Sequence, residues 1–157
     1  MEIVRDALIN SKKCIGVADH MLTQTMKFVQ EPKILATVLN NIFSSMLYSM
    51  YALLFFERQK RRIPPFHNNY VSRIYMFRIK VAPRYGLAQY LKTIEELKEL
   101  SDRHQETPID FSGSNNNPFS SQKKTSITEE NIKKYLETST SFLMKVEEII
   151  KREESTE

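Results

Sequence analysis

The stretch that decides the fold is residues 34–56, ILATVLNNIFSSMLYSMYALLFF, which contain 23 consecutive residues without a charge. Polar side chains recur along it at helical spacing, with leucine, isoleucine and methionine on the opposite face. The polar positions are Thr37, Asn41, Ser44, Tyr48 and Tyr51, with Asn40 and Ser45 beside them. A membrane span could have this length, but lipid could not satisfy the polar stripe. We therefore predict a central bundle helix over about 33–61, whose polar stripe meets another helix, a cleft or a second subunit; a membrane-anchored form is the less favoured alternative.

Three further helical regions are expected around this segment. The first covers residues 3–29, where apolar side chains repeat every seven residues. Another begins near Asn68 or Asn69, either of which could cap it, is kinked or broken by Pro83 and Gly86, and continues to about residue 104. The last begins after Thr128, because acidic residues follow that N-cap and complement the helix dipole. The inward positions of the first and last of these helices are Val4, Leu8, Ser11, Ile15, Ala18, Leu22, Thr25, Met26, Val29, Ile132, Tyr135, Leu136, Ser139, Phe142, Leu143, Val146, Ile149 and Ile150.

The composition agrees with one all-α domain over residues 1–157. The chain has only three glycines, too few for a turn-rich sandwich or barrel and too scattered for a phosphate-binding loop. We predict an up-and-down bundle of four to five helices. Residues 105–125 are rich in serine and asparagine and are expected to form a long, mobile loop, and residues 152–157 a frayed tail.

The location is predicted to be cytoplasmic. Cys14 is the only cysteine, so it has no internal disulfide partner, and its amphipathic setting indicates a packed thiol rather than a nucleophile. The first ten residues, MEIVRDALIN, do not resemble a signal peptide. No histidine has a second ligand at helical spacing, so neither a metal nor another cofactor is expected.

The positive charge is concentrated in the middle of the chain. Residues 57–84 contain eight basic side chains and one acid, Glu57, whereas residues 85–157 contain ten basic and fourteen acidic ones. Such a surplus attracts phosphate groups, and RNA is therefore the expected partner of this segment. The candidate substrate-binding residues are Arg58, Lys60, Arg61, Tyr70 and Arg73.

Arg62 and His67 are the candidate catalytic pair within this segment. A histidine can exchange a proton with a ribose 2′-hydroxyl or a leaving oxygen near neutral pH. An arginine can hold a phosphate and stabilise the charge of the transition state. The same residues also allow a structural interpretation, in which His67 caps the next helix and the arginines stabilise the end of a helix.

The layout resembles the HEPN superfamily. The resemblance lies in two long antiparallel helices, an R-x4-6-H element after the second, here RIPPFH from Arg62 to His67, and a closing C-terminal helix. It covers most of the chain, although catalytic members usually place a polar residue after the arginine, where this chain has Ile63. The resemblance implies a homodimer whose two Arg–His elements form one composite cleft, with Arg62 on the scissile phosphate and His67 transferring the proton.

Two functions are compatible with these patterns. The first is an RNA-associated HEPN-like protein, acting as a metal-independent endoribonuclease in a toxin–antitoxin or defence setting, with an antitoxin or nucleotidyltransferase as a possible partner protein. The second is a non-catalytic helical module for dimerisation or docking, which carries a basic surface patch. The first requires Arg62 and His67 in one exposed cleft, and the second is favoured if the prolines between them turn the two side chains apart.

Overall fold

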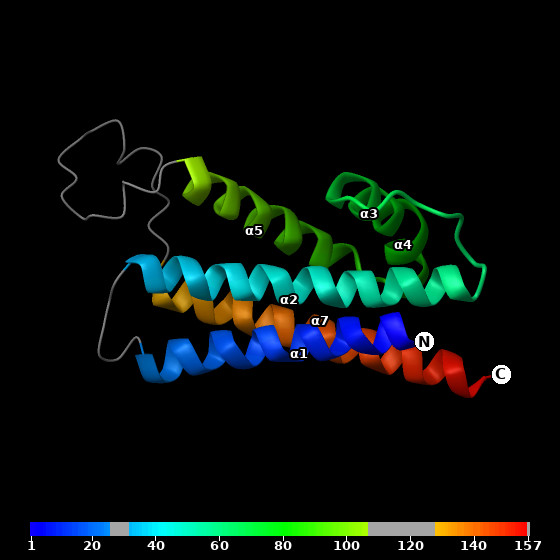
Figure 1. The fold of residues 1–157 in the computed structure, drawn as a ribbon, viewed down its shortest axis with the longest axis horizontal. Helices are drawn as coiled ribbons and strands as arrows, with labels where there is room; N and C mark the ends of the chain where they lie inside the picture. The colour runs from blue at the N-terminus through cyan, green and yellow to red at the C-terminus, as the bar shows by residue number, and fades with distance from the viewer. Residues whose placement is uncertain (26–31, 107–127, 157) are drawn as a thin grey trace.

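A computed structural model describes residues 1–25, 32–106 and 128–156 and shows the predicted all-α bundle. Its long helices are α1 (Glu2–His20), α2 (Pro32–Gln59), α5 (Ala88–Glu106) and α7 (Glu129–Ser155). Successive long helices alternate in direction, as predicted for an up-and-down bundle (Figure 1). α2 is central, because it packs against α1, α5 and α7.

α1 follows the predicted amphipathic pattern and continues as a π-helical turn, η1 (Met21–Thr25). Its most buried side chains are Val4, Ala7, Ser11, Ala18 and Leu22. The predicted heptad positions Leu8 and Ile15 are only half-buried, so they flank the buried face instead of forming its centre. Residues 26–29 of the predicted helix lie outside the described residues.

The predicted third helical region consists of three consecutive pieces, α3 (Tyr70–Met76), the π-helical η2 (Phe77–Val81) and α4 (Ala82–Tyr85). Asn69 is its N-cap, since its side chain accepts a hydrogen bond of 2.8 Å from the backbone of Ser72. Pro83 does not end this helix. It lies just after the π-helical turn, which is the local widening expected where proline lacks an N–H and crowds the preceding turn. The end comes at Gly86, whose φ of 67° is the left-handed conformation common at helix C-termini.

α7 begins at the predicted cap. The Thr128 side chain accepts a hydrogen bond of 3.1 Å from the Asn131 backbone. The helix continues through Ser155, well into the segment predicted to fray. Residues 107–125 of the predicted loop lie outside the described residues.

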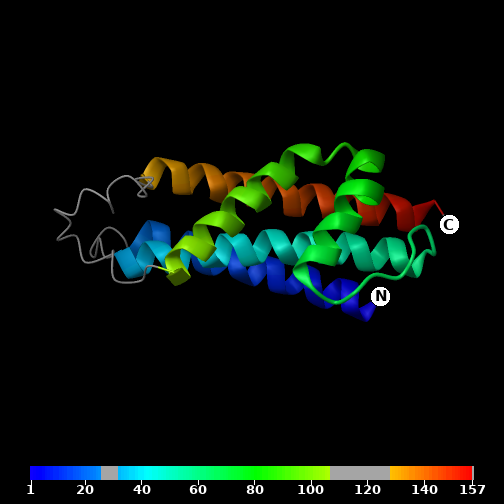
Figure 2. The same cartoon turned by 90° about the horizontal axis from the view of Figure 1, so that it is seen from above.

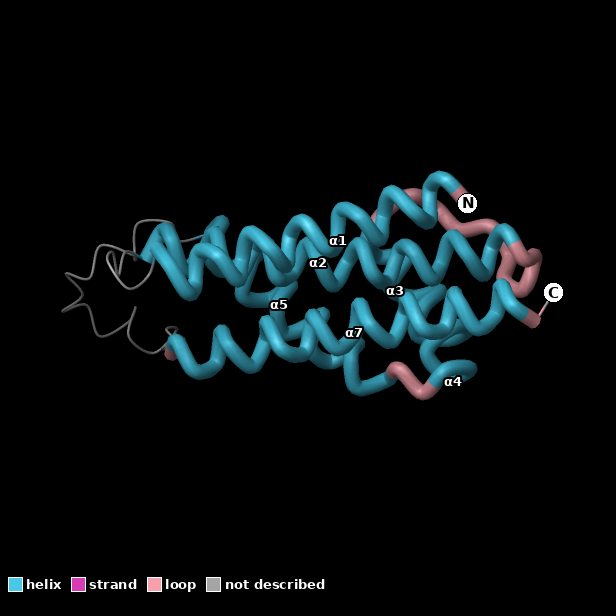
Figure 3. The backbone as a smooth tube through the Cα atoms, turned by 90° about the horizontal axis from the view of Figure 1, so that it is seen from below, coloured by secondary structure: helices cyan, strands magenta, loops and turns pink. Residues whose placement is uncertain are grey.

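A cluster of buried serines joins α1, α2 and α7 at the centre of the bundle. Ser11 of α1 bonds to Ser45 and Ser49 of α2 at 2.9 and 2.8 Å between side-chain oxygens, and Ser139 of α7 bonds to Ser45 at 3.1 Å. All four are buried, and their small side chains allow the helices to approach closely. Figure 3 shows α7 running beside the α1–α2 pair that these bonds connect.

The outer face of α2 carries the predicted polar stripe. Among its members, Thr37 is exposed, whereas Asn41, Ser44, Tyr48 and Tyr51 are half-buried. By length and composition, Lys33–Gln59 could cross a membrane, but 56% of its apolar window is buried inside the bundle. A core helix of a bundle passes the same test, so this is weak evidence for a membrane span.

Candidate functional site

The basic segment 57–84 occupies one end of the bundle. It comprises the last turn of α2, a connection without regular structure, and α3, η2 and α4 (Figure 2). The C-terminus of α7 lies at the same end. All eight basic side chains and both members of the predicted catalytic pair therefore lie in one part of the molecule.

The chain leaves α2 through a tight turn that positions Arg62. The Arg62 N–H donates to the carbonyl of Glu57 at 3.0 Å, and the Arg61 N–H donates to that of Arg58 at 2.9 Å. This pair of bonds is the helix ending in which glycine usually occupies the left-handed position. Here Arg61 occupies it with a φ of 58°, and its exposed side chain projects from the turn.

Glu57, the only acid of the segment, is buried beneath this turn with a side chain 1% exposed. Arg84 approaches its Oε2 at 2.9 Å, Arg62 approaches its Oε1 at 3.4 Å, and the Tyr85 hydroxyl donates to Oε1. Arg62 also reaches Glu153 of α7 at 3.4 Å. Arg62 thus belongs to an ionic cluster around a buried carboxylate that joins α2, α4 and α7, and we call these five residues the Glu57 cluster.

The cluster raises the pKa of two of its members, Tyr85 and Arg62. Burial, the hydrogen bond to Glu57 and the charge of Glu57 raise the pKa of Tyr85 to about 12, so its hydroxyl remains a donor at neutral pH. For Arg62, burial alone would lower the pKa of the guanidinium, but the nearby Glu57, Tyr85 and Glu153 raise it overall. Both effects stabilise the pairing seen in the structure.

Arg58 and Arg73 take a different arrangement, because each lies against aromatic rings. The guanidinium carbon of Arg73 is 4.0 Å from the ring centre of Tyr51 and 5.2 Å from that of Phe55. That of Arg58 is 5.2 Å from Phe55 and 5.0 Å from Phe66. The Phe55 and Phe66 rings stack with centroids 6.1 Å apart. We call these five side chains the arginine–aromatic stack, in which the rings hold the guanidinium planes in place.

Hydrogen bonding in this stack is incomplete. Arg73 donates through Nη2 to the Asn68 side chain, while its buried Nε has no hydrogen-bond partner among the described residues. All five side chains of the stack are half-buried, so it forms part of the surface. A surface of this kind presents fixed positive charge next to aromatic rings, the combination that binds single-stranded nucleic acids.

The structure separates the roles of the two predicted catalytic residues. His67 is exposed, whereas Arg62 is engaged in the Glu57 cluster. Within the described ranges, no hydrogen bond or ion pair joins Arg62 and His67.

Two of the predicted substrate-binding residues lie against other side chains. The Lys60 amine is 5.5 Å from the centre of the Phe56 ring. Tyr70 is half-buried, and the Lys98 amine lies 5.4 Å from the centre of its ring. Burial, followed by Tyr51 and Asp102, raises the pKa of Tyr70, while Arg78 acts in the opposite direction.

Sequence reasoning missed the Glu57 cluster. Apart from the pair of Arg62 and Glu57, which are five positions apart, its contacts join residues 23 to 91 positions apart, as in the bonds from Arg62 to Tyr85 and to Glu153. The one available signal was that Glu57 is the single acid in a basic segment at the end of an apolar helix. Such an acid requires neutralisation if it is buried.

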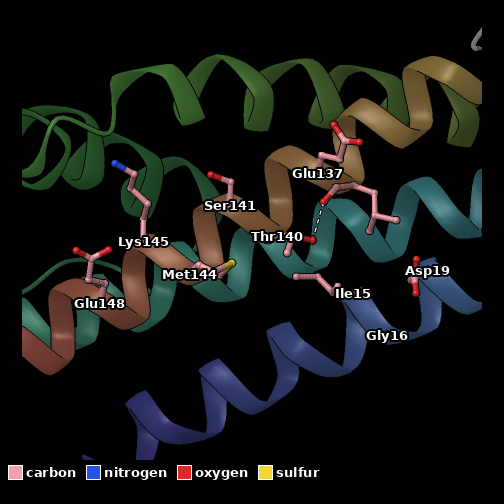
Figure 4. A pocket seen from close by; sticks show the side chains of 10 residues that line it. Ile15, Gly16, Asp19, Glu137, Thr140, Ser141, Met144, Lys145 and Glu148 are labelled. Atoms are coloured by element: carbon pink, nitrogen blue, oxygen red, sulfur yellow. Dashed lines mark hydrogen bonds between the residues drawn. The ribbon is translucent and has the colours of Figure 1, made fainter.

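A groove of about 750 Å³ lies away from the basic segment, between α1 and α7. Ile15 and Met144 line its apolar part, and Asp19, Lys145 and Glu148 lie at its rim (Figure 4). Cys14 precedes Ile15, which lines this groove, in the chain. The Cys14 side chain is half-buried, and burial raises the pKa of its thiol. This agrees with the predicted packed thiol.

Comparison with known proteins gives no family to which the chain can be assigned. No family model, curated protein or solved structure matches it. In the part of the chain that the structure describes, no group of three or more His, Cys, Asp or Glu side chains is placed to hold a metal ion.

Proposed function

We propose that the protein binds RNA through the surface formed by its basic segment. The observation that carries the proposal is the burial of Glu57. Because the only acid among residues 57–84 is 1% exposed and paired with Arg62 and Arg84, it does not offset the charge of the other cations at the surface. Acids from other helices reach only part of the segment, as in the pair between Arg78 and Glu95.

The remaining cations are suited to a phosphate backbone. Arg61 projects from its turn, and Arg58 and Arg73 are held against aromatic rings. A stacked guanidinium retains N–H groups at its edge that can bind phosphate oxygens, and it loses little conformational entropy when it does so. Half-buried Phe66 adds an aromatic surface on which bases can stack.

In this proposal Arg62 does not bind RNA itself but stabilises the structure that carries the binding surface. Its pairing with Glu57 and Glu153 places the α2–α3 connection against α7. A phosphate would have to compete with two carboxylates for its guanidinium. RNA binding without catalysis is therefore the function that the arrangement supports best.

Binding can be measured by the fluorescence anisotropy of a labelled, mixed-sequence single-stranded RNA. Arg61→Glu should weaken binding about tenfold or more, because it reverses a charge on the proposed surface. Lys13→Glu, an equal reversal at an exposed position of α1, should have little effect. Equal affinities for the two variants, or no binding by the native protein, would contradict the proposal.

The predicted endoribonuclease activity has its own test. The labelled RNA is incubated in EDTA with the native protein, His67→Ala or Arg62→Lys. Cleavage that survives the chelator and disappears in both variants would show catalysis at the predicted pair, whereas intact RNA would leave binding alone. Membership of the HEPN superfamily, an antitoxin or nucleotidyltransferase partner and a cytoplasmic location stay predictions.

A further inference from the structure

The groove between α1 and α7 extends along most of both helices. Its larger part, of about 750 Å³, is lined on α1 by Ile15, Gly16 and Asp19. A second part, of about 470 Å³, lies beside the beginning of α1, and Glu148 of α7 borders both parts, so they adjoin. From Leu136 to Glu154 the groove follows α7 for about 27 Å, which is about five helical turns.

Apolar side chains at heptad spacing form the α1 side of this groove. Met1, Leu8 and Ile15 repeat every seven residues, and all three line it. The chain itself does not bury them, since Met1 is exposed and the other two are half-buried. On α7, Met144 is 64% exposed and points into the same space (Figure 4). Seven-residue spacing is the pattern by which helices pack along one another, so the open side of this stripe fits a further helix.

The charge of the groove is opposite to that of the basic segment. Asp19, Glu137 and Glu148 are exposed around its larger part, and Lys145 is the one cation among the described residues that line it there. No ion pair neutralises the three acids in the part of the chain that the structure describes. The smaller part has nearly equal numbers of acids and bases, which are Glu147, Glu148, Glu154, Arg5 and Lys151, with Lys12 paired to Glu147 at 2.9 Å. The surplus of negative charge therefore lies at the Asp19 end.

We propose that this groove binds an amphipathic helix of another protein, with its apolar side against α1 and α7 and lysine or arginine on its flanks. A hydrophobic groove between two helices accepts a third helix through apolar residues spaced three, four and seven positions apart. The flanking cations would approach Asp19, Glu137 and Glu148, and this charge complementarity selects the partner. The flexible side chain of Met144 can adapt to the apolar residues that enter.

The same features argue against other occupants. RNA and anionic lipid would bring negative charge to three exposed acids. A second copy that presented the same groove would place these acids against each other. A small apolar ligand would fill only part of so long a groove. The proposal does not depend on RNA binding, because the groove shares no residue with the basic segment 57–84.

The length of the groove sets the size of the partner helix and its expected affinity. A helix that fills the groove has about 18 residues. One helix of this length buries less than the roughly 800 Å² per partner of a standard stable interface, so binding should be in the micromolar range.

Fluorescence anisotropy with designed peptides tests the proposal. The probe is a labelled helical peptide of about 18 residues, with leucines along one face and lysines on both flanks. In one control peptide glutamates replace the lysines, and in another the basic sequence is scrambled so that the apolar face is lost. The basic amphipathic peptide should bind about tenfold or more tightly than either control. Equal binding of the three peptides, or no binding of the basic one, would overturn the proposal.

Substitutions at the apolar lining locate the bound peptide. Met144→Lys should weaken binding of the basic peptide about tenfold or more, because it places a cation at the apolar lining of the groove. Val71→Lys, the same kind of change at a position of α3 that is 72% exposed, should have little effect. Circular dichroism checks that both variants remain helical. Equal effects of the two substitutions would place the peptide elsewhere and overturn the proposal.

Substitutions at the rim test the charge complementarity. Glu148→Lys should also weaken binding of the basic peptide and reduce its dependence on salt, whereas Glu130→Lys, at an exposed position of α7 outside the groove, should not. Sedimentation of the native protein alone and with anionic vesicles tests the other occupants. Self-association or vesicle binding that Met144→Lys abolishes would assign the groove to a second copy or to lipid and overturn the proposal.

Discussion

Two polar clusters lie along α2, one at its middle and one at its end, and they stabilise the buried polar atoms in different ways. The serine cluster at Ser45 is neutral and is completed by hydroxyls from α1 and α7. The Glu57 cluster is charged and requires two arginines and a tyrosine around one carboxylate. The first costs little to bury and permits close packing, whereas the second ties the end of the bundle together only while its cations remain in place.

The difference matters for function because only the charged cluster affects the surface. By drawing Glu57 inward, it leaves Arg58, Arg61 and Arg73 at a surface whose own acid is out of contact with solvent. The serine cluster has no such consequence. At the end of α2, the burial of Glu57 therefore contributes both to the packing of the bundle and to the proposed RNA-binding surface.

The largest effect is expected at the neutral cluster. Ser45→Leu should lower the free energy of unfolding by about 3 kcal/mol, because it inserts bulk where three helices meet and removes the hydroxyl that pairs with Ser11 and Ser139. Denaturant unfolding measures it. Ser44→Leu, one residue away on the outer face, should cost less than about 0.5 kcal/mol. Similar losses for the two variants would show that Ser45 is not tightly packed.

The charged cluster should be the next most sensitive. Arg62→Ala is expected to lower the free energy of unfolding by about 2 kcal/mol, because the buried Glu57 then retains only Arg84 and Tyr85. The neighbouring Arg61→Ala should change it by less than about 0.5 kcal/mol. If the two variants unfold alike in denaturant, Arg62 has no structural role and becomes available as a phosphate ligand.

The turn that ends α2 offers a smaller gain in stability. Arg61→Gly should raise the free energy of unfolding by about 0.5 kcal/mol, since glycine adopts the left-handed conformation without the cost that a side chain imposes. Gln59→Gly, within the last turn of α2, should have the opposite sign. Thermal unfolding of both variants distinguishes them, and a loss of stability in Arg61→Gly would contradict the observed turn.

Tyr85 gives an effect that is confined to alkaline pH and is absent under neutral conditions. The folded protein holds its proton more tightly than the unfolded chain, because its pKa is raised from 10 to about 12. The stability from this proton is present below pH 10 and is lost as the pH rises through about 12. In Tyr85→Phe, an absorbance titration should lack one late-ionising tyrosine. An unchanged titration would place the raised pKa on another residue.

The helices could be predicted from the sequence because their signals are local. Thr128 and Asn69 cap helices as expected, and Gly86 ends one. Spacing alone places Ser11 and Ser139 in inward stripes, but their meeting at Ser45 depends on the relative shift of three helices. Local patterns do not contain that shift.

The candidate site was harder to predict, for the same reason. The concentration of positive charge was visible in the sequence, and so was the Arg62–His67 spacing. One of the two carboxylates that pair with Arg62, Glu153, lies 91 positions away in a segment predicted to fray. Pairwise spacing also could not show that Arg58 and Arg73 share the ring of Phe55.

The salt dependence of RNA affinity tests the central claim most directly. A plot of the logarithm of the binding constant against that of salt concentration should be linear, with a negative slope of about 0.7 for each phosphate contacted on a single strand. The Arg58→Ala/Arg61→Ala double variant should bind more weakly and flatten the slope by roughly 1.4, the contribution of two contacts. An unchanged slope, or binding that does not respond to salt, would contradict the assignment of the basic segment as the RNA surface.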